Sequence, residues 1–305
     1  MNHMTMATRL ESPTPEILQA MAELCLCLGN AFLPPRDADF RLGMIDALCD
    51  DLRELDGILA FAGPGQIEHL SERLRSLPPE QEDLLRIYSR LFLSPPTPAT
   101  LNAGVFLDGN IMGQAALGME SLYQKYQLAK DSGFRDLPDH LSLQLQFIAY
   151  LLALPVEKDA PGDALLDASE FISAYMTPWL PALAEQCARA EHDHHLPDIY
   201  SRLAELVHRA LDRIRPDLPL PRAAGVVQAG ADLHRPTMEP PQGEPVACCR
   251  CGKPFLVDNE LSNLISRLTS QGLDASHLSV CAQCRTGSLG LHPMTPPQAK
   301  KPGRG

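Results

Sequence analysis

Apolar side chains recur every three or four positions through most of the first two hundred residues. This spacing puts them on one face of an α-helix, and prolines such as Pro34-Pro35 stand where several of the stripes end. Residues 14–215 contain no segment with the alternation of a strand, so the pattern predicts an all-α bundle. The stripes cover residues 17–32, 40–55, 67–77, 84–92, 116–126, 141–152, 171–176 and 199–214.

Two segments stand out within this pattern. Residues 141–152 are apolar around most of the predicted helix, which is typical of a helix at the centre of a bundle. Residues 94–111 contain three prolines and two glycines. We predict a loop there, and loops of this length in compact domains are often functional.

The sequence changes character after residue 215. Residues 216–246 contain seven prolines and three glycines, which predicts a semi-rigid linker. We therefore divide the chain into an all-helical domain (1–215), the linker (216–246), a cysteine-rich module (247–290) and a disordered tail (291–305).

Composition and charge limit the classes of function that we expect for this chain. Hydrophobic residues make up 45% of the chain and aromatic residues 5%, and abundant Leu and Ala favour helices. The formal net charge of -12 excludes nucleic acid as a partner, because phosphate binding needs a basic surface. The sequence lacks a run of roughly 18 apolar residues and an apolar leader segment, so we expect a cytoplasmic protein without membrane insertion.

Five of the nine cysteines cluster near the C-terminus, where they include two CxxC pairs. Four thiolates in this arrangement suit a tetrahedral metal site, and Zn²⁺ would contribute folding energy to so small a module. An iron–sulfur cluster is the alternative. Cys249 is an additional thiol beside the pairs. The predicted metal ligands are Cys248, Cys251, Cys281 and Cys284.

Three segments of the helical region resemble the TorD/DmsD/NarJ family of molybdoenzyme maturation chaperones. Residues 88–95 (YSRLFLSP) are similar to the family's Tyr-x-x-Leu-Phe helix, which ends before a proline loop. Residues 137–147 (LPDHLSLQLQF) resemble its Pro-x-Asp-His signature and the Leu-Glu-Phe stretch that follows. Residues 178–181 (PWLP) resemble its Pro-Trp element.

The resemblance implies an all-α chaperone that binds the twin-arginine signal peptide, or another part, of a molybdenum-cofactor oxidoreductase subunit. The chaperone holds the apo-subunit until the cofactor is inserted. Such a peptide is basic and then apolar, so its receptor needs carboxylates and an apolar groove. The candidate peptide-binding residues are Asp139, His140, Tyr88, Phe92 and Gln144.

Other interpretations stay open. Asp139 alternatively serves as a helix N-cap, and His140 as a structural hydrogen-bonding group. The sequence supplies no nucleophile or second base beside His140, so we expect no enzyme. The rival functions are a zinc-dependent adaptor or regulator and an iron–sulfur electron-transfer accessory protein. A homodimer is left open.

Overall fold

The structure, a computed structural model, describes residues 13–35, 38–78, 83–111, 113–131, 134–156, 163–221, 244–247, 254–257 and 291–293. The chain divides into two compact units. The helical unit comprises Met1–Ala129 with Arg135–Ala224, and the second unit comprises Lys130–Phe134 with Gly225–Gly305.

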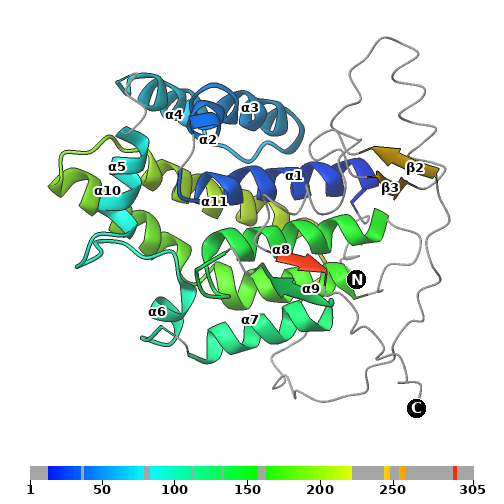
Figure 1. The fold of residues 1–305 in the computed structure, drawn as a ribbon. Helices are drawn as coiled ribbons and strands as arrows, with labels where there is room; N and C mark the ends of the chain where they lie inside the picture. The colour runs from blue at the N-terminus through cyan, green and yellow to red at the C-terminus, as the bar shows by residue number, and fades with distance from the viewer. Residues whose placement is uncertain are drawn as a thin grey trace, which may run out of the picture. The chain divides into compact units, whose positions relative to one another are not determined.

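The described part of the helical unit is almost entirely helical (Figure 1), which confirms the predicted all-α class. Of three further short segments, η1 and η3 are 3-10 helices and η2 is a π-helix. In chain order the elements are α1 (Pro15–Ala31), α2 (Ala38–Asp46), α3 (Leu48–Leu59), α4 (Gln66–Arg75), α5 (Asp83–Phe92), α6 (Ala103–Leu107), α7 (Gln114–Lys125), β1 (Leu128–Lys130), α8 (Leu141–Ala153), η1 (Leu154–Val156), α9 (Ala164–Phe171), η2 (Ile172–Met176), α10 (Leu180–Asp193), α11 (Tyr200–Ile214) and η3 (Arg215–Asp217).

Helices α1 and α8 pack along each other in the middle of the helical unit (Figure 1). Eleven of the thirteen residues of α8 are buried, which confirms the central helix predicted over 141–152. A Cβ added to Gly29 of α1 would lie 3.2 Å from the Leu145 Cβ and 3.4 Å from the Ser142 carbonyl oxygen. The missing side chain of Gly29 therefore lets the two helices approach closely.

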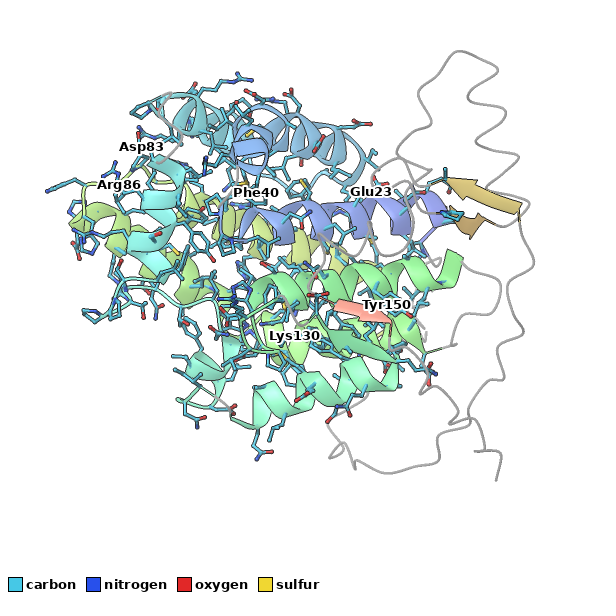
Figure 2. The ribbon with its side chains drawn as sticks, in the orientation of Figure 1. Glu23, Phe40, Asp83, Arg86, Lys130 and Tyr150 are labelled. Atoms are coloured by element: carbon cyan, nitrogen blue, oxygen red, sulfur yellow. The ribbon has the colours of Figure 1, made fainter. Side chains whose placement is uncertain are left out.

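Helices α3 and α11 also pack on α1, and α10 packs on α11. Capping residues explain where α1 begins, since the Thr14 hydroxyl accepts a hydrogen bond from the Ile17 N–H at 3.4 Å and Pro15 occupies the first helical position. Helix α5 presents a polar outer face. Asp83 and Arg86 form an ion pair there at 3.2 Å (Figure 2).

Several elements differ from the prediction. Helix α9 begins at Ala164, seven residues before the predicted stripe over 171–176. The stripe over 40–55 forms two helices that meet at Ala47, whose carbonyl accepts hydrogen bonds from both Asp50 and Asp51 at 3.0 Å. The predicted loop over 94–111 contains the short helix α6. Helix α10 was not predicted, because its apolar residues are interrupted by charged and small ones.

In the second unit the structure describes three short strands. Strands β2 (Glu244–Ala247) and β3 (Pro254–Val257) pair antiparallel with Ala247 opposite Pro254, and β4 is Leu291–Pro293. The boundary between the two units at Ala224–Gly225 lies inside the predicted linker. The fourfold division of the chain itself stays a prediction.

Several sequence-based predictions lie outside the described residues. They include most of the linker and the tail, and the four predicted ligands Cys248, Cys251, Cys281 and Cys284. Among the helices that the structure describes, none is both long and apolar enough to cross a membrane.

Candidate functional site

The three segments that resemble chaperone signatures all contact the connection between α5 and α6, together with α6 itself. Residues 99–107 of this region are termed the strap. The Ala99 N–H donates to the Leu91 carbonyl at 3.2 Å, which ties the strap to α5. An antiparallel bridge between Asn102 and His140 ties it to the start of α8. The backbone hydrogen bonds of this bridge run from Leu141 N to the Leu101 oxygen (2.8 Å) and from Ala103 N to the Asp139 oxygen (3.1 Å).

The Asp139 carboxylate holds the strap from the inside of the bundle. Its side chain is 0% exposed. Its Oδ2 accepts a hydrogen bond from the Gly104 N–H at 2.7 Å, and its Oδ1 accepts one from the Asn102 side-chain amide at 3.2 Å. A Cβ on Gly104 would lie only 2.9 Å from that Oδ2, so the contact requires glycine. A buried carboxylate is stable here because charge-assisted hydrogen bonds replace its hydration.

His140, and not Asp139, is the N-cap of α8, so the N-cap interpretation of Asp139 is wrong. The His140 Nδ1 accepts a hydrogen bond from the Ser142 N–H at 3.2 Å, which leaves the ring proton on Nε2. That Nε2 lies 3.9 Å from the Asp136 carboxylate. Burial lowers the pKa of His140, while Asp136 and Asp139 act in the opposite direction. The interpretation of His140 as a structural hydrogen-bonding group is confirmed.

Two further side chains fix the backbone just before α8. The Gln144 Nε2 donates to the Asp139 carbonyl at 2.6 Å, and the Tyr123 hydroxyl of α7 donates to the Pro138 carbonyl at 2.8 Å. Burial, and then the charge of Asp139, raises the pKa of Tyr123, which keeps this hydroxyl a donor. The Gln144 Oε1 is buried and has no hydrogen-bond partner within the described residues. Asp139 and its neighbours are therefore held rigidly from two helices.

The aromatic side of the strap rests on the Pro-Trp segment. Phe106 of α6 stacks on Trp179 with ring centroids 5.2 Å apart and planes inclined by 30°. Trp179 is 0% exposed, and its indole N–H donates to the Tyr175 carbonyl at 2.6 Å. Tyr175 belongs to η2, a π-helical segment of a kind found frequently at functional sites.

Tyr88 and Phe92 lie in a separate aromatic cluster between α1, α5 and α11. The Tyr88 hydroxyl donates to the Phe32 carbonyl at 3.2 Å, and the Tyr88 ring lies 5.0 Å from Phe92 and 5.7 Å from Tyr200. Tyr88 is 2% exposed, whereas Phe92 is half-buried. This cluster stabilises the bundle, and Phe92 is its member that reaches the surface.

The predicted peptide-binding residues thus fall into two groups. Asp139, His140 and Gln144 meet at the start of α8, and Tyr88 and Phe92 meet on α5. Only Phe92 of the five is more than slightly exposed.

Sequence reasoning missed the residues on the strap that these groups contact, namely Asn102, Gly104 and Phe106. Their only sequence signal is the predicted loop over 94–111, which contains three prolines and two glycines. It also passed over Asp136, a carboxylate with a 45% exposed side chain that accepts a hydrogen bond from Asn102 at 3.0 Å.

The helical unit is similar to proteins that are already known. Residues 48–185 match the family model of the nitrate reductase delta subunit. The chaperone protein TorD from two Vibrio cholerae serotype O1 strains is 33% identical over 132 residues. That match covers 41% of this chain and 60% of each relative, so the chain spans less than two thirds of these relatives.

A solved structure of a candidate redox enzyme maturation protein from Archaeoglobus fulgidus is 20% identical, with a TM-score of 0.32. The match covers 56% of this chain and 94% of that one. The range of the family model includes all three segments that meet at the strap. The helical region of this chain is therefore similar to the nitrate reductase delta subunit family and to the chaperone protein TorD.

Proposed function

We propose that this chain is a cytoplasmic chaperone, not an enzyme, for a molybdenum-cofactor oxidoreductase. It binds the twin-arginine signal peptide, or another part, of the apo catalytic subunit and assists cofactor insertion before export or assembly. The observation that carries this proposal is the family match over residues 48–185, since the relatives with 33% identity are chaperones by name.

The geometry supports a binding role built around the strap. Burial of Asp139, His140 and Gln144 means that a peptide contacts these side chains only when the strap separates from α8. While the strap lies against α8, these residues hold it in position. Asp139 binds the Gly104 amide, and His140 forms the backbone bridge with Asn102. Peptide contact then falls on the outer side of the strap and on exposed groups beside it.

Copurification of the tagged full chain from its native cells tests the proposal. Mass spectrometry of the eluate should identify the precursor of a molybdenum-cofactor oxidoreductase with its leader intact. Growth without molybdate keeps the client in its apo form, so recovery of the precursor should increase. Recovery of mature enzyme alone, or no oxidoreductase under either condition, would contradict the proposal.

We also propose that Cys248, Cys251, Cys281 and Cys284 bind one Zn²⁺. The donor set supports this, because four thiolates form a closed tetrahedral zinc site that stabilises a small module. The pairing of Ala247 with Pro254 further supports it. It brings together the two chain ends that flank residues 248–253, which carry the first CxxC pair. The part of the chain that the structure describes contains no other group of three His, Cys, Asp or Glu suited to a metal.

Metal analysis of the purified full chain tests this site. We expect about one zinc ion per chain, and loss of zinc in Cys248→Ser with Cys281→Ser. Cys27→Ser, which changes a half-buried thiol of α1, is the control and should retain zinc. Iron with acid-labile sulfide and visible absorbance would show that the four cysteines hold an iron–sulfur cluster and not zinc. A metal-free chain would contradict any metal site.

A further inference from the structure

The outer side of the strap continues into an apolar surface on α6 and α7. Helix α6 packs on α7 (Figure 1). Ile111, in the turn before α7, is 62% exposed, and Leu117 on α7 is 50% exposed. Val105 and Leu107 on α6 are half-buried. The α6–α7 surface consists of Val105, Leu107, Asp108, Ile111, Leu117 and Glu120.

Helix α7 has distinct inner and outer faces. Its inner face buries Ala115, Ala116, Met119 and Tyr123. At Gly118 the Tyr175 hydroxyl of η2 leaves no room for a Cβ, so this side of α7 is in close contact with the bundle. Leu117 lies instead on the stripe of exposed residues Gln114, Leu117, Ser121 and Gln124, with Glu120 one turn away. Packing within the described helical unit therefore does not explain Leu117.

The charged residues of the segment that carries this surface have one sign. Residues 91–124 contain no Lys, Arg or His, and their charged side chains are Asp108 and Glu120. The next basic residue along the chain, Lys125, forms an ion pair with Asp167 of α9. A surface for anionic lipid would need basic residues beside the apolar ones. An apolar surface with carboxylates instead fits a peptide that carries both apolar and basic residues.

We propose that the α6–α7 surface is the docking site for the client's leader. The apolar segment of the leader packs on Ile111 and Leu117, and its basic residues lie toward Asp108 and Glu120. This inference rests on the proposed chaperone function and assigns the contact to residues that sequence patterns did not identify. Because Phe106 joins α6 to Trp179, the only tryptophan of the chain, docking also changes the surroundings of that indole.

The test titrates the full chain with a labelled, tryptophan-free synthetic peptide that contains two arginines and the apolar run of a twin-arginine leader. Fluorescence anisotropy gives Kd, and Trp179 emission reports on the strap. The double variant Ile111→Gln with Leu117→Gln should raise Kd tenfold or more, since each side chain loses apolar burial in the complex. Leu42→Gln with Ile58→Gln is the matched control. Both of its residues are 52% exposed but lie on α2 and α3, so its Kd should equal that of the wild type.

A second variant, Glu120→Gln, keeps the size of an exposed side chain and removes its charge. It should weaken binding and flatten the dependence of Kd on salt. If the wild type binds no leader peptide, the proposed function and the docking site both fail. If the wild type binds and the Ile111/Leu117 variant binds within twofold of it, the docking site alone is wrong. A wild-type dimer that this variant converts to monomer, with unchanged peptide affinity, would make the surface a contact between copies and would overturn the proposal.

Discussion

The Asp139 carboxylate accepts a 2.7 Å hydrogen bond from the backbone N–H of Gly104, a residue 35 positions earlier in the chain. The carboxylate is buried, and a Cβ at residue 104 would come within 2.9 Å of it. One side chain before α8 therefore fixes the position of a helix on a distant connection. The same strap carries Phe106 against Trp179, so the polar and aromatic contacts both hold α6 in place.

Replacing Asp139 with Ala should lower the free energy of unfolding by about 2–3 kcal/mol, because the Gly104 N–H is left buried without an acceptor. Urea unfolding of the full chain, followed by Trp179 fluorescence, measures the change. The control Asp46→Ala removes an exposed carboxylate and should change stability by less than about 0.5 kcal/mol. Unchanged stability with lost peptide affinity would instead mean that Asp139 contacts the peptide directly.

Replacing Gly104 with Ala should destabilise the protein by about 1–3 kcal/mol, since the added methyl group meets Asp139 and the Asn110 carbonyl. Gly57→Ala makes the same chemical change in α3, where nothing lies within 4 Å of the added Cβ. It should stabilise the protein by up to about 1 kcal/mol through helix propensity. Equal melting temperatures for the two variants would refute the close contact at Gly104.

His140 makes stability depend on acidity. Burial lowers its pKa in the folded chain, whereas the unfolded chain protonates it near 6.5. The stability that neutral His140 contributes is present above pH 6.5 and is lost as the pH falls from 6.5 through the lower folded value. His140→Asn keeps an N-cap acceptor without titrating. Unfolding measured from pH 7.5 to 5 should show a smaller acid loss in the variant, and parallel curves would contradict the assignment.

Glu191 should make the stability of the fold depend on pH in the opposite direction to His140. Its carboxylate accepts hydrogen bonds from the Tyr200 and Ser201 N–H groups at 2.7 and 3.2 Å at the start of α11. Burial nonetheless raises the pKa of Glu191 to about 7. Its contribution is therefore fully present below pH 4.5 and is lost as the pH rises through 7. Glu191→Gln should remove this loss between pH 5 and 8, and an unaltered pH profile would disprove it.

Phe106→Ala should expose Trp179 to solvent, because Phe106 of the strap covers the indole. The expected result is a red shift of tryptophan emission and faster quenching by acrylamide, with about 1–3 kcal/mol lost in stability. Phe92→Ala removes another half-buried ring that has no contact with Trp179 among the ring pairs described, so it should leave the emission maximum unchanged. A red shift in both variants would indicate general loosening of the bundle.

Sequence patterns predicted the elements that local residues determine. Residues 141–152 are apolar on nearly every side, so their central position follows from composition alone. The break at Ala47 leaves the apolar stripe intact, and α6 has five residues and no side-chain cap, so neither has a local signal.

In the candidate site, too, the sequence predicted only the residues that have a local signal. Its sequence signature led to Asp139 and His140, but the partner of Asp139 is a backbone amide 35 residues away. Burial of that pair results from the pairing of the strap with the start of α8, which spacing does not reveal. Conversely, the cysteine spacing predicts a metal site from local residues alone, and that prediction concerns positions outside the described residues.

Isothermal titration of the full chain with the leader peptide of its copurified oxidoreductase tests the central claim most directly. Chaperone function predicts saturable binding at about one peptide per chain, and at least tenfold weaker binding when both leader arginines are replaced by glutamine. Absence of heat with the native leader, or equal affinity for the two peptides, would contradict recognition of a twin-arginine leader by this chain.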